Sequence, residues 1–300
     1  MRFERLDLNL LVAFDVLIEE RSVSAAAKRL NLSQPALSGA LNRLRDFFKD
    51  ELLVQSGRQM ILTPKAVELR GPVREALLLI RTRVTTPAQF DPATATREFK
   101  IVASDYLFNI FLAEVIAELA VIAPGLSFEI TPPEASSVER LERGDIDLLI
   151  TIQTHLVAHH PSRSLFSDEH AVICWSESKY RGGVDIETFL AARHAVACFG
   201  PTRLVAYSEA WFSQQDIART IEVRVPAFTF LPQAVIGTDR LATIQRRYAE
   251  YYARSLPIKV LPMPFSLPLL HERVQWHTMR SGDVGLSWLV NTIGQRADAL

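Results

Sequence analysis

Apolar residues recur at helical spacing through the first part of the chain. Residues 8–20 carry such a pattern, and Asp7 precedes it as an N-cap. An alanine-rich helix over 25–30, capped by Ser24, and a third helix from Ser33 to about Phe47 follow. Only the dipeptide 31–32 separates the last two helices. The pattern therefore predicts two short helices joined by a tight turn.

A hairpin and a long helix are expected next. Residues 52–62 form two strand-like arms around Ser56-Gly57-Arg58. Thr63 caps a helix whose apolar stripe runs to Val84 and would suit a partner helix. Because Gly71-Pro72 interrupts this helix, it is expected to be bent or in two pieces. Residues 85–96 contain two prolines and no periodicity, which indicates a linker between domains.

From residue 98 onward, strand-like and helix-like segments alternate. Strands are expected at 98–104, 126–130, 146–152, 170–175, 194–199, 221–226, 241–244, 258–263 and 274–278. Helices are expected at 108–122, 138–143, 186–192, 203–215, 230–237, 247–252 and 284–293. Interleaved strands and helices predict a mainly parallel α/β domain.

Composition fits an ordinary globular protein of about two domains. The 300 residues are 48% hydrophobic and 22% charged, and the net charge of −1 divides into +4 over residues 1–90 and −5 over the rest. No apolar run reaches the ~18 residues of a membrane span, and no signal peptide is recognisable. A cytoplasmic location without membrane contact is expected, and Cys174 and Cys198 are expected to be reduced.

The third helix has the surface of a DNA-reading element. Leu37, Leu41 and Leu44 can form its buried side, which leaves short or planar polar groups on the other side. Gln and Asn can read adenine, and Arg can read guanine or hold phosphate. The alternative is an ordinary helical pair. Arg58 suits a wing contact, although a turn arginine without a role is equally plausible.

Five motifs occur in order between residues 6 and 66. They are AAKRL (26–30), SQPALS (33–38), LNRL (41–44), Leu52-Leu53 and Thr63-Pro64. In this order they resemble the LysR-type transcriptional regulators, and the opening residues are similar to the branch with the nodulation D and salicylate-responsive regulators. Leu53, Val54 and Gln55 depart from the residues that are frequent in the family at these positions, which weakens the case for a wing contact from that side. Residues 141–150 (LERGDIDLLI) resemble a second family motif.

The resemblance implies a fold and a domain plan. The fold is an all-α winged helix-turn-helix domain at 1–63, a linker and dimerisation helix at 64–89, and an α/β effector domain of periplasmic-binding-protein type at 90–300. Subdomain I would comprise 90–164 and 269–300, and subdomain II would comprise 165–268. A change of the gap between subdomains on ligand binding would alter the arrangement of the paired DNA-binding domains.

The resemblance also implies partners and site residues. The partners are double-stranded operator DNA, a small aromatic effector, a second copy or three further copies of the chain, and RNA polymerase; the role is that of an activator. The DNA-binding residues would be Ser24, Ser33, Gln34, Pro35, Ala36, Ser38, Gly39, Asn42, Arg43, Arg45 and Arg58.

An effector would lie at strand ends and helix N-termini between the subdomains. Residues 201–203 are expected to open a helix whose free N–H groups could bind an anion, and His170 matches a histidine of the aromatic-responsive branch. The candidate contacts are Ser104, Asp105, Tyr106, Thr151, Gln153, His170, Thr202, Arg203, Phe228, Phe230, Trp276 and His277. Packing or capping is the alternative for each of them.

Other chemistries find little support. His155, His159 and His160 lie in an expected loop without a nearby acidic partner, so no metal site is predicted. No nucleophile elbow, P-loop or dinucleotide fingerprint occurs, so no enzyme activity and no cofactor are expected. The alternatives are a regulator that responds to no ligand, and an enzyme with an appended DNA-binding domain.

Overall fold

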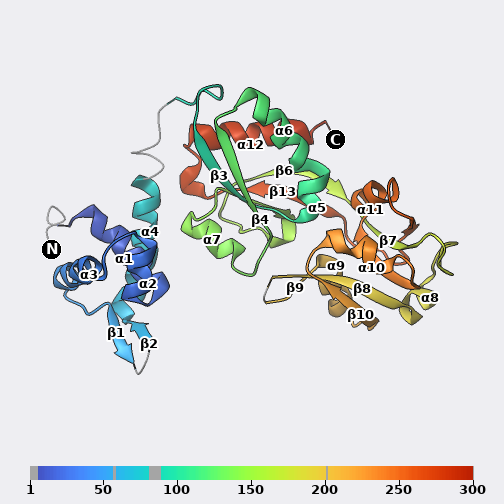
Figure 1. The fold of residues 1–300 in the computed structure, drawn as a ribbon, viewed down its shortest axis with the longest axis horizontal. Helices are drawn as coiled ribbons and strands as arrows, with labels where there is room; N and C mark the ends of the chain where they lie inside the picture. Colours follow the sequence, from blue (N-terminus) through green and yellow to red (C-terminus); the bar gives the residue numbers. More distant parts are fainter. Residues whose placement is uncertain (1–5, 57–58, 81–88, 201, 300) are drawn as a thin grey trace. The chain divides into compact units, whose positions relative to one another are not determined.

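The computed structural model describes residues 6–56, 59–80, 89–200 and 202–299. It divides into two compact units, Met1–Thr86 and Pro87–Leu300. The first unit contains α1 (Leu8–Glu20), α2 (Val23–Arg29), α3 (Gln34–Phe48), β1 (Leu53–Ser56), β2 (Gln59–Leu62) and α4 (Pro64–Leu79) (Figure 1).

Side-chain caps fix where the helices of the first unit begin. Asp7, Ser33 and Thr63 cap α1, α3 and α4, as predicted. The cap of α2 was assigned wrongly: Ser22 Oγ accepts the hydrogen bond from the Ala25 N–H at 3.3 Å, and Ser24 already lies inside the helix. Both serines suit a cap chemically, and Ser22 takes the position because its backbone is extended.

The linker helix was expected to be bent or in two pieces. The structure has one helix, with Pro72 inside it, which excludes the two-piece alternative. Pro72 is exposed, so water can reach the backbone carbonyl that its missing N–H leaves free. Much of the apolar stripe packs onto α1, with Ala66, Val73 and Leu77 in the core of this unit. Val84 and residues 85–88 of the linker lie outside the described residues.

The second unit contains a five-stranded sheet, a six-stranded sheet and their helices. The strands are β3 (Arg97–Val102), β4 (Leu126–Thr131), β5 (Leu148–Ile152), β6 (Ser162–Asp168), β7 (His170–Trp175), β8 (Arg193–Phe199), β9 (Leu204–Val205), β10 (Thr220–Val225), β11 (Arg240–Gln245), β12 (Ile258–Pro262) and β13 (Leu270–Gln275). The helices are α5 (Asp105–Leu107), η3 (Phe108–Leu112), α6 (Ala113–Ile122), α7 (Ser137–Arg143), η4 (Gln153–His155), α8 (Ile186–Ala191), α9 (Tyr207–Gln214), η5 (Phe228–Phe230), α10 (Leu231–Val235), α11 (Arg246–Ala253), η6 (Thr278–Arg280) and α12 (Val284–Ala297).

Both sheets are mixed, so the prediction of a mainly parallel domain is wrong. The first has the order β4-β3-β5-β13-β6, with β13 antiparallel to both neighbours. The second has the order β10-β8-β11-β7-β12, with β7 antiparallel to both neighbours, and β9 pairs with β8. The chain crosses to the second sheet after β6 and returns to the first sheet after β12. The first strand after each crossing, β7 or β13, runs antiparallel to both of its neighbours.

Two strands of the first sheet were misplaced by the pattern. β6 was not predicted, because SRSLFSD has no regular alternation, and β13 begins at Leu270 rather than at 274. The boundary between the subdomains was predicted after residue 164. Because β6 stays paired in the first sheet up to Asp168, the chain changes sheet after that residue.

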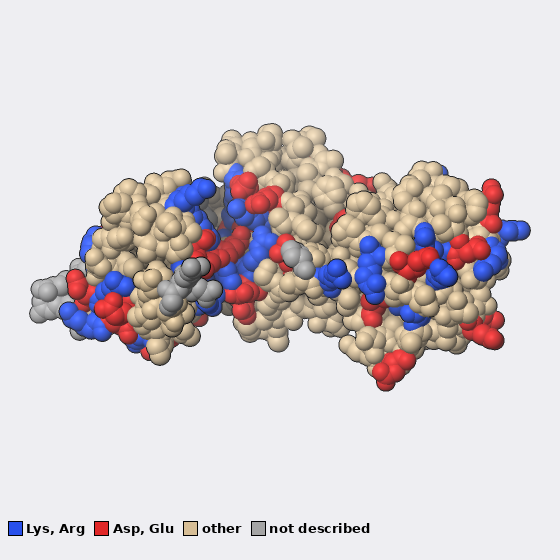
Figure 2. All heavy atoms as spheres, turned by 60° about the horizontal axis from the view of Figure 1, so that its bottom comes forward, with Lys and Arg blue, Asp and Glu red and all other residues tan. Residues whose placement is uncertain are grey.

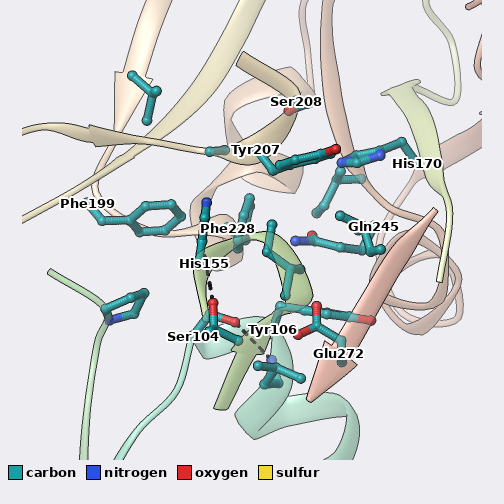
Figure 3. Close-up of a pocket in the computed structure, with 18 of the residues that line it drawn as sticks. Ser104, Tyr106, His155, His170, Phe199, Tyr207, Ser208, Phe228, Gln245 and Glu272 are labelled. Atoms are coloured by element: carbon teal, nitrogen blue, oxygen red, sulfur yellow. Dashed lines mark hydrogen bonds between the residues drawn. The ribbon is translucent and has the colours of Figure 1, made fainter. Parts of the chain in front are cut away.

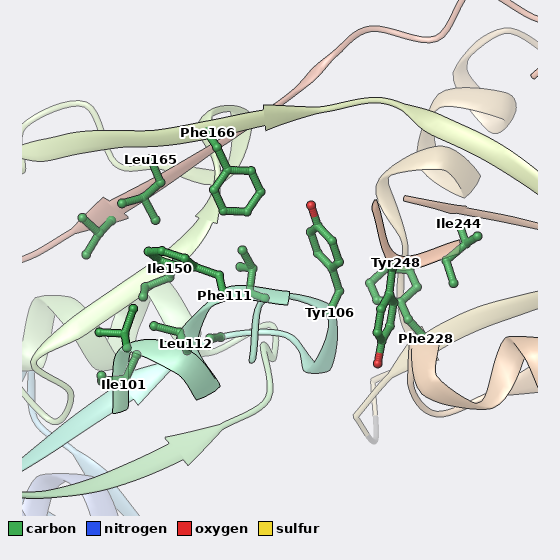
Figure 4. Packing of buried hydrophobic residues seen from close by; sticks show 14 of the residues in the cluster. Ile101, Tyr106, Phe111, Leu112, Ile150, Leu165, Phe166, Phe228, Ile244 and Tyr248 are labelled. Atoms are coloured by element: carbon green, nitrogen blue, oxygen red, sulfur yellow. The ribbon is translucent and has the colours of Figure 1, made fainter. Parts of the chain in front are cut away.

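Alternating residues of each strand face different helices. Ile101, Leu148 and Ile150 point toward α6 and α12, whereas Val102 and Leu149 meet Leu141 of α7. The second sheet repeats this arrangement, with α10 and α11 on one face and α8 and α9 on the other. Phe111, Phe166 and Tyr106 bring the core of the first sheet up to Tyr248 and Phe228 of the second (Figure 4). The two sheets therefore share one continuous core on their facing sides.

Candidate functional site

Helix α3 presents a polar face supported by leucines. Leu37, Leu41 and Leu44 are buried, which confirms the predicted inner face. The exposed predicted DNA contacts on or next to this helix are Ser33, Gln34, Pro35, Ala36, Gly39, Asn42 and Arg43, while Ser38 is half-buried. Nothing lies within 4 Å of where a Cβ of Gly39 would be, so the helix surface is open there.

Arg45 is held by the protein itself. Its Nε donates to the carbonyl oxygen of Glu51 at 2.9 Å, and its Nη2 donates to that of Leu53 at 2.8 Å. This guanidinium therefore ties α3 to the start of β1, which argues for a positioning role over a contact with bases. Arg43 pairs with Asp7 at 3.2 Å and remains largely exposed.

The remaining predicted DNA contacts lie at the edge of this surface. Ser24 is exposed near the start of α2, and it lines a shallow concavity with Ser22, Gln34 and Met60. The concavity joins the N-terminal ends of α2 and α3. Arg58 at the hairpin tip lies outside the described residues. In the view of Figure 2, basic and acidic side chains are interspersed over the surface of the chain.

A cavity lies where the two sheets of the second unit meet. Its empty space is about 650 Å³, which includes open solvent at its mouth. Figure 3 shows side chains from both sheets around it. The lining residues are Ser104, Tyr106, Leu107, Pro133, Ile150, Thr151, Ile152, His155, His170, Phe199, Leu204, Val205, Ala206, Tyr207, Ser208, Phe228, Thr243, Ile244, Gln245, Leu270 and Glu272.

Five of the twelve predicted effector contacts line this cavity. They are Ser104, Tyr106, Thr151, His170 and Phe228. Ser104 also caps α5 through its hydroxyl, which accepts from the Leu107 N–H at 3.3 Å. Strand ends and helix starts thus led to residues that line one cavity, while the other seven predicted contacts lie outside it.

Thr202 and Arg203 do not line the cavity. The predicted helix at 203 begins only at Tyr207, after the short strand β9. Both residues are exposed in a turn in which Arg203 has a φ of 53°, so no helix N-terminus forms there. Pro201 lies outside the described residues.

The other five predicted contacts are used elsewhere or point away. Asp105 accepts a hydrogen bond from the Thr229 N–H at 2.6 Å and so connects α5 to η5. Gln153 and Phe230 are exposed. Trp276 packs against the core, and the His277 ring lies 4.5 Å from the ring of His160.

Sequence reasoning missed several lining residues that only tertiary structure brings together. Thr243 and Gln245 occupy alternating positions on β11, and Gln245 pairs with His170 in the register of β7. The ring of Tyr207 stacks on that of His170 at 6.1 Å. Glu272 comes from the first half of β13, ahead of residue 274, where the predicted strand began. Period-two alternation along β11 was the one signal that could have indicated Thr243 and Gln245.

Burial changes the protonation of the groups around the cavity. It raises the pKa of Glu272 to about 8, with a smaller contribution from the Asp168 carboxylate, and it lowers the pKa of His170 to about 4. Burial also lowers the pKa of His155. Asp168 accepts a hydrogen bond from the Tyr106 hydroxyl at 2.8 Å at the point where the chain crosses between the sheets. At pH 7 both Glu272 and His170 are therefore neutral.

One expectation about the histidine loop is corrected. Glu142 does lie nearby: with His159 and His160 it forms a group whose potential ligand atoms all lie within 4.8 Å of one another. The Nδ1 of His160 accepts from the Thr278 N–H at 3.4 Å, which leaves its proton on Nε2. In this tautomer His160 has no lone pair for a metal.

Comparisons with known proteins agree with the two-unit organisation. Residues 8–67 match the family model described as bacterial regulatory helix-turn-helix protein, lysR family, and residues 92–298 match the LysR substrate binding domain. Within the described ranges, no helix is long and apolar enough to cross a membrane.

Individual relatives extend over the whole chain. Nodulation protein D 2 of Rhizobium leguminosarum bv. phaseoli is 38% identical over 303 residues, covering 100% of this chain and 95% of that protein. The crystal structure of the probable transcriptional regulator PA0477 from Pseudomonas aeruginosa has a TM-score of 0.64 and 28% identity, with 97% of each chain covered. CbnR in complex with its target DNA shares the fold, with a TM-score of 0.51, 16% identity and coverage of 97% and 100%.

Both parts of the chain match models of a bacterial regulatory family, which favours a regulator over an enzyme with an appended DNA-binding domain. The helix-turn-helix surface, the α/β unit with its cavity and the two family matches lead to one conclusion: the chain belongs to the LysR family of DNA-binding transcriptional regulators.

Proposed function

We propose that this regulator is a transcriptional activator controlled by a small aromatic effector that binds in the cavity between the two sheets. The observation that supports this most is the composition of the cavity wall. Phe199, Phe228 and Tyr207 supply aromatic faces, and the lining comes from both sheets. A ligand that contacts both sheets can favour one arrangement of them over another, which is the physical requirement for control.

The DNA contacts form the other part of the proposal. Gln34 and Asn42 read base edges from α3, and Ser33 and Ser24 support contacts with the phosphate backbone. The chain acts as a dimer or tetramer on a dyad-related operator in the cytoplasm, since one recognition helix reads one half-site. Contact with RNA polymerase completes the activator role. The DNA complex of CbnR and the name of nodulation protein D are consistent with this proposal.

The effector site is tested with a pair of matched substitutions. Thr151→Trp places a large ring at a half-buried position on the cavity wall, whereas Thr202→Trp places the same ring at an exposed position outside the cavity. A strain in which the DNA upstream of the chain's own gene drives a reporter gene is first screened with aromatic compounds. We expect T151W to lose induction while it keeps operator binding, and T202W to respond like the parent. The opposite result would place the effector elsewhere, and transcription that no compound changes would favour a ligand-independent regulator.

The base contacts are tested after the operator has been selected from random DNA. Gln34→Ala or Asn42→Ala should reduce the binding free energy that distinguishes one base pair of each half-site by ~1–3 kcal/mol. The preference for that base pair should relax accordingly. Glu75→Ala, at an exposed position on α4, is the control and should leave the preference unchanged. An equal loss on operator and unrelated DNA would exclude a base-reading role for that residue.

A further inference from the structure

A closed ring of hydrogen bonds joins elements of the two sheets of the second unit. Asn109 Nδ2 donates to the Asp105 carbonyl oxygen at 2.9 Å and to the Tyr248 hydroxyl at 2.8 Å. The hydroxyls of Tyr248 and Tyr252 lie 3.1 Å apart, and that of Tyr252 lies 2.5 Å from Thr229 Oγ1. The Thr229 N–H closes the ring by donating to the Asp105 carboxylate at 2.6 Å. We call these five residues the bridging ring.

The bridging ring crosses from one sheet to the other twice. Asp105 and Asn109 lie in α5 and η3, which follow β3 of the first sheet. Thr229 lies in η5, and Tyr248 and Tyr252 lie in α11, next to the second sheet. The two crossing bonds, from Thr229 to Asp105 and from Asn109 to Tyr248, join residues 124 and 139 positions apart. Their lengths therefore depend on how the two sheets are placed relative to each other.

The polar groups of the bridging ring are matched to one another. The Asn109 amide nitrogen only donates, so the Tyr248 hydroxyl accepts from it. Tyr248 can then donate to Tyr252, and Tyr252 can donate to Thr229. Burial raises the pKa of Tyr248, so its hydroxyl keeps the proton that it donates.

This complete pairing distinguishes the bridging ring from the cavity wall. Thirteen buried side-chain nitrogen and oxygen atoms of the described residues lack a hydrogen-bond partner, and none of them belongs to the bridging ring. Four of them belong to residues that line the cavity: His170, Thr243, Gln245 and Glu272. A network whose members are all paired acts as a unit, because removal of one member leaves its neighbours unpaired.

The bridging ring lies directly beside the cavity. Ser104 and Tyr106, on either side of Asp105, line the cavity, and so does Phe228, which precedes Thr229. A ligand that moves the wall of one sheet relative to the wall of the other therefore changes the distances across the bridging ring.

A second polar contact joins the sheets where the chain itself crosses. The rings of Tyr106 and Tyr248 lie 5.7 Å apart, and Figure 4 shows their hydroxyls pointing in opposite directions. The Tyr106 hydroxyl donates to Asp168, at the crossing after β6, whereas the Tyr248 hydroxyl belongs to the bridging ring. Because the crossing is covalent, it persists in any arrangement of the sheets, and the bridging ring is the contact that can open.

We propose, building on the control of this regulator by an effector in the cavity, that the bridging ring is a latch between the two sheets. Its closure stabilises the arrangement described here, and its opening is part of the switch between the inactive and the active regulator. Asn109 and Tyr252 do not line the cavity, so they act as positioning residues of the latch. In a two-state equilibrium, weakening one arrangement populates the other and strengthens the binding of a ligand that favours the other.

Hydrogen exchange in the full chain, followed by mass spectrometry, tests whether the bridging ring is one unit. In Tyr252→Phe and in Asn109→Ala, the Thr229 N–H should exchange about threefold to tenfold faster than in the wild type. The double variant should exchange little faster than either single variant, since one opening already breaks the ring. Tyr251→Phe removes the same hydroxyl from an exposed position on α11 and should match the wild type. Unchanged exchange in both single variants, or a double variant that multiplies their effects, would overturn the latch.

The reporter strain tests whether the latch belongs to the switch. Y252F and N109A should change uninduced transcription by about threefold or more, in the same direction as each other. The half-effective concentration of the inducing compound from the aromatic screen should change in the opposite direction to uninduced transcription, whichever arrangement the latch stabilises. A merely structural role would lower the amount of protein, measured by immunoblot, without this linked change. Y251F should behave like the parent.

The outcomes separate the latch from effector control. Parent-like transcription in both Y252F and N109A, or changes of uninduced transcription and half-effective concentration in the same direction, would overturn the latch. A parent strain that no compound induces would refute effector control instead. In that case altered uninduced transcription together with faster exchange at Thr229 would still support the latch, and parent-like values of either would overturn it.

Discussion

The buried carboxyl of Glu272 predicts how stability changes with pH. Glu272 is 3% exposed, and its pKa is raised from 4.5 to about 8, mainly by burial and further by Asp168. A group whose folded-state pKa is raised stabilises the protein fully below its unfolded pKa, and this stability is lost as the pH rises toward the folded pKa. The wild-type chain should therefore lose stability through this group between about pH 4.5 and pH 8.

Glu272→Gln removes this loss, because an amide stays neutral. Each pKa unit corresponds to about 1.4 kcal/mol, so the free energy of unfolding of E272Q should exceed that of the wild type by ~3 kcal/mol at pH 7, relative to their difference near pH 4.5. The advantage should grow with pH and level off above about pH 8.

Urea unfolding followed by tryptophan fluorescence measures this difference in the full chain. All four tryptophans (Trp175, Trp211, Trp276 and Trp288) belong to the second unit, so the signal reports the unit that contains Glu272. Glu177→Gln at an exposed position is the matched control and should give a constant difference from the wild type. A difference between E272Q and the wild type that stays constant from about pH 5 to about pH 8.5 would refute the assignment of a neutral buried carboxyl.

Three further substitutions test particular contacts. Arg45→Ala should destabilise the first unit by ~2 kcal/mol, because it removes the hydrogen bonds from α3 to Glu51 and Leu53. It should weaken binding to all DNA sequences alike. A changed base preference in a binding-site selection would instead indicate that Arg45 reads bases directly. Ser33→Ala should lower the free energy of unfolding of the first unit by ~1 kcal/mol, because α3 loses its N-cap. Thermal unfolding measures this, and an unchanged midpoint would contradict it. Gly125→Ala should destabilise the second unit by ~2 kcal/mol, since a Cβ there would lie 2.4 Å from the backbone oxygen of Ala95; equal urea midpoints would show that the backbone can move aside.

Local patterns predicted most elements of both units. The caps at Asp7, Ser33 and Thr63 were identified correctly, because a cap is a contact between residues three or fewer positions apart. The strands that the pattern missed were β6, the first half of β13 and the short strand β9. The chain leaves the first sheet after β6 and returns to it at β13, and neither SRSLFSD nor LHERVQ has a periodicity that reveals its partners.

The residues predicted to contact an effector and the residues that line the cavity overlap only in part. Ser104, Tyr106 and Thr151 were found because they lie at or next to strand ends. The helix start expected at Thr202 and Arg203 was wrong, since these residues form a turn outside the cavity. Glu272 escaped notice because its position depends on the pairing of β13 with β5, a contact across more than a hundred residues.

By itself, then, the sequence determined the family, the helix-turn-helix with its leucine-supported polar face, and the succession of strands and helices. These follow from spacing and capping, which act over a few residues, and from motif order. Tertiary structure decided that the sheets are mixed, that Arg45 holds β1, and that Glu272, Gln245, Thr243 and His170 meet around one cavity. The reason is physical: burial, and the pKa shifts and unpaired atoms it creates, arise only when strands distant in sequence are packed together.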